Sequence, residues 1–269
     1  MSATLLQGAG ARLTRVRARR TKTDGAEEKD AKSLRPVYIS MGTVAQAPGS
    51  AYIEVGNCKI LCSVHGPRPD AASAPFSTTG RIACTVNFAD FAGVAESEIE
   101  REEAQVQMAV RPALECAVLL EKYPKSVLDV QLLVLEAAGD VEAPCITCGA
   151  LALAHAGVEM LDLVAAVAVA RHPGSGKLEI DPAQPGWEIG GGSLLLASMP
   201  LRNEITQLSQ VGGRGGGQDW AVELFEEAMF LALEGCRQLH TLMRAALVEA
   251  STAPGKDVAE SSDAAMKEG

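Results

Sequence analysis

The chain has 269 residues, of which 47% are hydrophobic and 22% charged, a composition typical of one large globular domain or two small ones. Its formal net charge of -10 excludes a surface that binds nucleic acid over its whole area, because phosphate binding draws on Lys and Arg. Aromatic residues make up only 4%, which disfavours a base-stacking platform. Neither a long uncharged apolar run nor a secretion signal is evident, so we expect a soluble intracellular protein.

The two ends of the chain differ in charge from its middle. Residues 12–22 (RLTRVRARRTK) carry six basic groups and no acid, whereas residues 255–269 are mildly acidic and poor in large apolar side chains. Such segments bury too little apolar surface to fold alone. We predict a flexible basic tail over residues 1–33 and a flexible acidic tail over 251–269, flanking one folded domain over 34–250. The arginines fit an RNA backbone contact, a localisation signal or an idle solvated segment.

Short β-branched segments separated by Gly and Pro follow the basic tail and are typical of strands. We expect them to form a β-meander over residues 35–44, 50–56, 58–66 and 80–88. Residues 67–80 are rich in Pro, Ala and Ser, which predicts a surface loop.

A helical pattern begins at Glu96, where apolar residues recur at steps of three and four as far as Pro124. Pro112 is expected to kink or divide this helix, because proline removes a backbone hydrogen bond. The later segments read as strand 126–137, small-residue helix 145–157, strand 160–172, strands 193–200 and 204–212, and a long helix over about 220–249. Strands and helices alternate without a repeated period, which predicts a single α/β (α+β) domain with mixed sheets packed against helices.

Cys145 and Cys148 form a C-x-x-C motif, which in redox proteins lies at a helix N-terminus. No second cysteine pair or nearby histidine completes a zinc site, and the flanking residues are apolar. We therefore expect both to be buried core residues, like Cys58 and Cys62. The seven cysteines are an odd number, which favours reduced thiols over a disulfide framework.

Other familiar catalytic patterns are missing from the sequence. The four histidines are scattered without a His-x-x-x-His step, and no G-x-S-x-G elbow is present, so a hydrolase triad has no support. The glycine-rich residues 212–218 (GGRGGGQ) lack the Gly-Lys-Ser/Thr ending of a phosphate-binding loop and predict a mobile linker. We predict no metal and no cofactor.

Several blocks of the chain resemble the RNase PH family, specifically the ring subunits of the eukaryotic RNA exosome. The resemblance is most specific in residues 34–69, which contain the block GSAYIEVGNCKILCSVHGPRP, and continues through 149–170 and the EITQL segment to the last helix. It covers residues 34–250 and implies an RNase PH-like fold.

Active members of this family remove nucleotides from RNA 3′ ends with inorganic phosphate as the attacking group. The resemblance implies that they hold this phosphate at a turn reading Gly-Gly-Thr/Ser-Arg-Thr, just before the small-residue helix. The corresponding residues here run from Gly139 to Ala143, and Glu142 stands where the phosphate-binding Arg is expected. A carboxylate about 4 Å from a phosphate is repelled by ~4 kcal/mol per unit charge at an effective dielectric of ~20. The sequence therefore predicts loss of phosphate binding, unless another cation in the fold restores it.

Two further positions separate this chain from the active members. Ser193 stands where they carry a carboxylate, and serine cannot act as a general acid or base at neutral pH. Asp181 matches another acidic position of the family, but we expect it to begin a turn. Of the Arg pair that contacts RNA in active ring members, Arg101 remains, with Glu102 beside it. Arg101 is the candidate RNA-binding residue, and an intrahelical ion pair with a neighbouring carboxylate is the favoured alternative.

These observations predict a non-catalytic structural subunit of the hexameric exosome ring, supporting 3′-to-5′ RNA processing and degradation, rRNA included. The expected partners are other RNase PH-like ring subunits, a cap protein and single-stranded RNA that passes through the assembled ring, in the nucleus, nucleolus and cytoplasm. Two alternatives remain open: an active phosphate-dependent 3′-to-5′ exoribonuclease, and a free RNA-binding protein that uses its basic tail.

Overall fold

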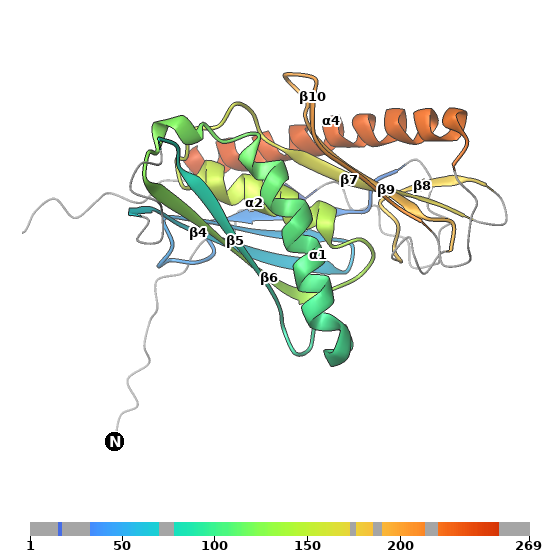
Figure 1. Cartoon of the computed structure of the whole chain (residues 1–269), viewed down its shortest axis with the longest axis horizontal. Helices are drawn as coiled ribbons and strands as arrows, with labels where there is room; N and C mark the ends of the chain where they lie inside the picture. The colour runs from blue at the N-terminus through green and yellow to red at the C-terminus, as the bar shows by residue number, and fades with distance from the viewer. Residues whose placement is uncertain are drawn as a thin grey trace, which may run out of the picture.

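Two β-sheets and the helices between and beside them make up the folded part of the chain (Figure 1). The computed structural model describes residues 33–69, 78–172, 176–184, 190–212 and 220–252, together with the backbone pairing of Val16 and Arg17. Within these ranges no helix has the length and apolar character needed to cross a membrane. The rest of both predicted tails and most of the glycine-rich segment lie outside the described residues, so the predictions for them stay predictions.

The first sheet has six strands in the order β1-β2-β3-β4-β6-β5. The strands are β1 (Val16–Arg17), β2 (Val37–Met41), β3 (Gly49–Val55), β4 (Cys58–Pro69), β5 (Arg81–Phe88) and β6 (Ser126–Glu136). All neighbours are antiparallel except β5 and β6, which are parallel. The predicted four-stranded meander is therefore wrong beyond β4. The strand β5 lies at the far edge because its connection to β6 runs through a helix, and such a crossover returns the chain in the same direction.

Helix α1 (Glu96–Glu115) is this crossover, and the 3-10 helix η1 (Leu120–Lys122) follows it. Pro112 was predicted to kink or divide α1; it lies inside one continuous helix, so it does not divide it, and the kink stays a prediction. Proline lacks the N–H group that would bond one turn back, so one intrahelical bond is lost. The buried residues Val110, Ala113 and Leu114 hold the last turns against the core.

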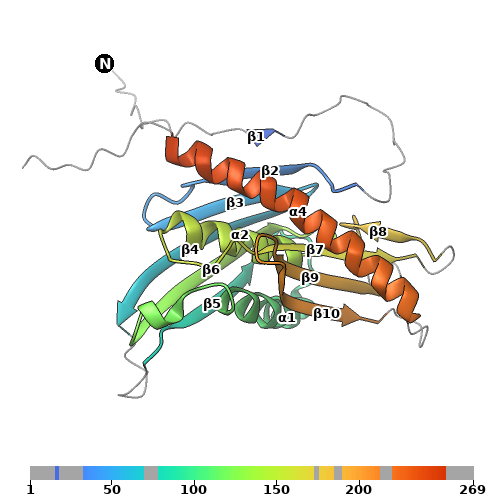
Figure 2. The ribbon, with the colours of Figure 1, turned by 90° about the horizontal axis from the view of Figure 1, so that it is seen from above.

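The second sheet has four antiparallel strands in the order β10-β9-β7-β8. The strands are β7 (Ala165–Arg171), β8 (Leu178–Ile180), β9 (Ser193–Met199) and β10 (Glu204–Val211), and the predicted pairing of the last two is confirmed. Every residue of β9 is buried, which is expected of a strand covered on both faces. The long helix α4 (Val222–Thr252) runs over β7, β8 and β9 and continues to β1 and β2 (Figure 2).

Helix α2 (Glu142–His155) lies between the two sheets and joins them into one core. It contacts β3 and β4 on one side and β7 and β9 on the other, and residues 143–153 are all buried. Cys145 and Cys148 lie in this helix as fully buried free thiols, and Cys58 and Cys62 are buried in β4, so all four are core residues as predicted. Burial raises the pKa of the Cys145 thiol, which disfavours the reactive thiolate.

Close packing of α2 on the first sheet depends on Gly49. A Cβ atom at Gly49 would lie 2.4 Å from the backbone oxygen of Ala152 and 2.4 Å from the Cβ atom of Ala156. We expect Gly49→Ala to lower the free energy of unfolding by about 1–3 kcal/mol, because backbone atoms must move to admit the methyl group. Chemical denaturation checks this. Gly212→Ala is the control, since a Cβ atom there meets nothing within 4 Å, and an equal loss in both variants would contradict the packing argument.

Candidate functional site

The turn that precedes α2 places a carboxylate of the chain itself at the start of the helix. One carboxylate oxygen of Asp140, Oδ1, accepts hydrogen bonds from the backbone N–H groups of Glu142 (3.0 Å) and Ala143 (3.4 Å). These are donors that a helix N-terminus otherwise offers to a bound anion. The Asp140 carboxylate therefore occupies the position where a phosphate oxygen would bind at such a terminus.

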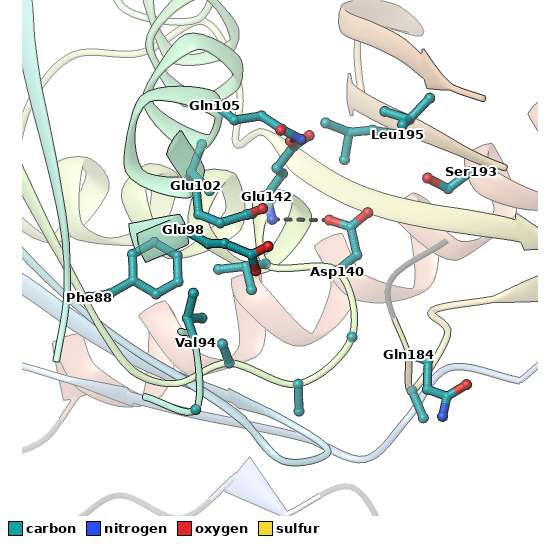
Figure 3. Close-up of a pocket in the computed structure, with 18 of the residues that line it drawn as sticks. Phe88, Val94, Glu98, Glu102, Gln105, Asp140, Glu142, Gln184, Ser193 and Leu195 are labelled. Atoms are coloured by element: carbon teal, nitrogen blue, oxygen red, sulfur yellow. Dashed lines mark hydrogen bonds between the residues drawn. The ribbon is translucent and has the colours of Figure 1, made fainter. Parts of the chain in front are cut away.

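The Glu142 side chain, which is half-buried, lies at the first position of α2 and faces α1. Its Oε1 atom accepts a hydrogen bond of 2.8 Å from Nε2 of Gln105 (Figure 3). Burial and, second to it, the neighbouring Asp140 charge raise the pKa of Glu142 to about 7, against the lowering effect of the hydrogen bond from Gln105. Burial also raises the pKa of Asp140, against the lowering effect of its two backbone hydrogen bonds. Both carboxylates thus lie where negative charge is unfavourable.

A cavity of about 460 Å³ opens beside this turn, between α1, the α2 turn and β9 (Figure 3). Four carboxylates line it: Glu98 and Glu102 from α1, and Asp140 and Glu142 from the turn. Among the residues that the structure describes, no Lys, Arg or His lines the cavity. A cation that could restore phosphate binding is therefore not among these described lining residues.

Ser193 is the first residue of β9 and lies in the wall of the same cavity. The structure thus brings together Glu142 and Ser193, the two positions at which the sequence departs from the active pattern (Figure 3). The Ser193 residue is buried. A hydroxyl in this place supplies no carboxylate for proton transfer.

Asp181 serves the structure of the turn rather than the cavity. Its Oδ1 atom accepts a bond from Nη2 of Arg35 at 2.5 Å, and its Oδ2 atom accepts the backbone N–H of Arg35 at 3.1 Å. Arg35 also donates from Nη1 to the backbone oxygen of Ala138 at 3.2 Å. Asp181 has a positive φ of 50°, in keeping with the predicted turn. The ion pair is almost completely buried and fixes the backbone that leads into α2.

The turn also needs glycine at position 139. Gly139 has a φ of 81°, and a Cβ atom there would lie 2.3 Å from the backbone oxygen of Pro182. Sequence reasoning named Gly139 only through the family motif and missed Arg35 altogether. A single Arg before a strand carries no local signal of a partner so far away in the chain.

Arg101 lies outside this site. It is exposed on α1 and is absent from the lining of the cavity. Within the described part of the chain it forms no ion pair, so the predicted intrahelical pair is wrong. Glu102, beside it, turns into the cavity instead, where burial raises its pKa and the Arg101 charge lowers it. Arg101 remains the candidate RNA contact on sequence grounds.

The site has little chemistry of its own. Among the described residues, no three His, Cys, Asp or Glu side chains lie close enough together to hold a metal ion. Arg35, which donates to the backbone oxygen of Ala138 in this turn, is already paired with Asp181. Glu142, with a pKa of about 7, can exchange a proton near neutral pH, and within the described part of the chain no Lys, Arg or His lines the cavity beside it.

Comparison with known proteins gives one consistent family. The family model described as "3' exoribonuclease family, domain 1" matches residues 33–159. The chain is 38% identical to human exosome complex component MTR3 over 84% of this chain and 87% of that protein. It is 35% identical to exosome complex component Rrp41 of Thermococcus gammatolerans, over 80% of this chain and 85% of that one.

Solved structures share the fold at lower identity. Rice Rrp46 matches with a TM-score of 0.69 and 19% identity, over 82% of this chain and 98% of that chain. The Archaeoglobus fulgidus exosome with RNA bound to the active site matches with a TM-score of 0.66 and 17% identity, over 78% and 89%. These two similarities confirm the predicted RNase PH-like fold of two sheets and packed helices. Together with the identity to curated relatives, they show that the chain belongs to the RNase PH family of exosome components.

Proposed function

We propose that this protein is a non-catalytic structural subunit of the exosome ring, supporting 3′-to-5′ RNA processing and degradation. One observation carries the proposal: the N–H groups at the start of α2 are bonded to the chain's own Asp140 carboxylate. A phosphate would have to displace this carboxylate before it could bind there.

Electrostatics oppose such an exchange. A phosphate about 4 Å from one ionised carboxylate is repelled by ~4 kcal/mol at an effective dielectric of ~20. Since the pKa of Glu142 is about 7, its charge is only partly present at neutral pH. Asp140, Glu98 and Glu102 line the same cavity, and none of its described lining residues is a Lys, Arg or His.

The surface supports a role in assembly. The strand β10 is the edge of the second sheet among the described strands, and Ile205 and Leu208 on it are 45% and 44% exposed. Long edge strands with apolar side chains are templates for association with another chain. The names of three relatives, each an exosome complex component, support membership of an exosome complex. Within such a complex we propose other RNase PH-like ring subunits and a cap protein as the partners. We further propose that the assembly works in the nucleus, nucleolus and cytoplasm and passes single-stranded RNA through the ring.

The decisive experiment purifies the tagged full chain from cells and measures both association and activity. We expect ring and cap proteins to co-purify in defined amounts. With single-stranded RNA and inorganic phosphate, we expect the chain alone to release no nucleoside diphosphates. Phosphate-dependent release that disappears in a Glu142→Ala variant would show instead that this site is active. Absence of ring proteins together with salt-sensitive RNA binding, lost on removal of residues 1–22, would favour the free RNA-binding protein.

A further inference from the structure

The cavity beside the α2 turn is lined by carboxylates and by apolar side chains. The carboxylates come from α1 and the turn, and the apolar side chains include Phe88, Val106 and Leu195. Its volume of about 460 Å³ lies within the roughly 300–1,000 Å³ of small-molecule sites, and one water molecule takes up only about 30 Å³. The cavity is therefore large enough for a small organic molecule.

The carboxylates of the cavity repel one another. Glu98 is exposed, whereas Glu102 and Glu142 are half-buried. Figure 3 shows Glu98 and Glu102 on the α1 side of the cavity, across from Asp140. Burial is the main cause of the raised pKa of Glu102, and the Glu98 charge adds to it. Burial and the Asp140 charge raise the pKa of Glu142, and the Glu102 charge does so as well. Positive charge placed among these groups would relieve this repulsion.

A buried hydroxyl without a partner faces the same space. Ser193 is only 6% exposed and lines the cavity. Figure 3 shows its oxygen directed toward the side where Asp140 lies. Among the described residues this hydroxyl has no hydrogen-bond partner. Because buried hydroxyl groups are usually hydrogen-bonded, its partner is expected to come from a molecule inside the cavity.

The arrangement of the charges favours an elongated cation over a metal ion. Among the described residues, no three acidic, His or Cys side chains lie close enough together to hold one metal ion. The four carboxylates belong to two different elements, so several positive charges at separate points match them better than one. An ammonium group has three N–H donors and no acceptor, which suits both a carboxylate and the Ser193 oxygen. Methylene groups between the ammonium groups suit the apolar part of the lining.

We propose that this acidic cavity binds an aliphatic polyamine, a linear methylene chain that carries several ammonium groups. Its ammonium groups pair with Glu98, Glu102 and Glu142, and one of them donates to the Ser193 hydroxyl. The Asp140 carboxylate keeps its bonds to the N–H groups at the start of α2. The Lys side chain of another protein is the less suitable occupant, because it carries a single charge. The proposal goes beyond the structural role in a ring and does not depend on it.

Titration calorimetry of the full chain with spermidine tests the proposal. We expect saturable binding of one molecule per chain at neutral pH and physiological ionic strength, where charges on the open surface are largely screened. The double variant Glu102→Gln/Glu142→Gln keeps the size of both side chains and should weaken binding at least about tenfold. The matched control, Glu226→Gln/Glu227→Gln, removes the same charge from exposed positions of α4 and should leave the affinity unchanged.

Ser193→Ala provides a second measurement that does not change the charge. We expect this variant to weaken spermidine binding about two- to tenfold, the usual effect of losing one hydrogen bond. Unchanged affinity in Ser193→Ala would contradict the predicted contact with the hydroxyl. Urea denaturation of each variant checks that it is folded under the conditions of the titration.

Three other results would overturn the proposal. Equal loss of affinity in the cavity variant and the α4 control would mean that spermidine is attracted by the acidic surface in general. Displacement of spermidine by Mg²⁺, one ion for one molecule at constant ionic strength, would assign the cavity to a metal ion. No binding to the free chain, with loss of a co-purifying protein in Glu102→Gln/Glu142→Gln, would assign it to a basic side chain of another protein. Co-purification of ring proteins with the wild type tests the structural role separately.

Discussion

Arg35→Met is expected to lower the free energy of unfolding by about 3–5 kcal/mol, the usual cost of removing one partner of a buried ion pair. The Arg35 and Asp181 side chains are only 8% and 11% exposed, so water cannot replace the lost partner. The substitution removes the guanidinium that donates to the buried Asp181 carboxylate and to the backbone oxygen of Ala138. Urea denaturation at neutral pH measures the change.

A second substitution tests whether the uncompensated charge causes the loss. Arg35→Met combined with Asp181→Asn removes both charges, and asparagine tolerates the positive φ of position 181. We expect the double variant to recover part of the lost stability, because the cost of a lone buried charge is gone. Arg202→Met is the control: its partner Glu204 lies at the surface, and such pairs contribute up to about 1 kcal/mol. An equally small effect at Arg35 would contradict the structural role of the pair.

The stability of the wild type is expected to fall as the pH rises from about 5 to about 8. The folded protein holds the Glu142 proton with a pKa of about 7, raised by burial and by Asp140 from an ordinary value of 4.5. Between those two values the folded state binds more protons than the unfolded state, so the free energy of unfolding decreases with pH. The loss of stability caused by ionising Glu142 in the folded protein is fully present above pH 7 and absent below about pH 4.5. Its size is on the order of 2–3 kcal/mol.

Glu142→Gln isolates this contribution. The amide keeps the size of the side chain and carries no charge, so we expect denaturation midpoints at pH 5 and pH 8 to move closer together than in the wild type. At pH 8 the variant should be the more stable of the two proteins. Glu227→Gln on the exposed face of α4 is the control and should leave the pH profile unchanged. A Glu142→Gln profile parallel to that of the wild type would show that Glu142 is ionised without penalty.

Proton uptake at this site bears on the function. As Glu142 becomes neutral below pH 7, its repulsion of an anion weakens, but Asp140 keeps its bonds to the helix N–H groups. Two features therefore oppose phosphate binding. Glu142 has a negative charge where a positive one is expected, and the Asp140 carboxylate already accepts the N–H bonds at the start of α2. Only the second is independent of the protonation of Glu142, and it is the stronger support for a structural role.

Local patterns predicted most elements because each rests on residues near one another in the chain. The β-branched runs of β2 to β4 and the spacing of apolar residues in α1 and α4 are such patterns. The predictions of strands and helices were wrong where contacts between distant parts of the chain set the structure. The strand β5 has the same local pattern as β4, yet it lies beyond β6 and parallel to it. Pro112 stays within α1 because the helix end packs on the core.

The candidate site could likewise be predicted from the sequence only in part. The replacement of a family Arg by Glu142 and of a carboxylate by Ser193 could be identified in the sequence through the family motifs. Their meeting in one cavity with Glu98 and Glu102 depends on how α1 and β9 pack against the α2 turn. The bond from Gln105 to Glu142 likewise crosses between two helices, and no sequence spacing indicates it.

The sequence by itself determined the family, most of the succession of strands and helices, the burial of Cys58, Cys62, Cys145 and Cys148, and the acidic character of the turn before α2. Each follows from residue type and short-range periodicity, or from motifs of contiguous residues. Only the tertiary structure decided that Asp140 bonds the helix terminus, that Asp181 is paired with Arg35 and that Arg101 is exposed outside the described lining of the cavity. These depend on distances between groups as far as 146 residues apart in the chain, which are set by the packing of the whole domain.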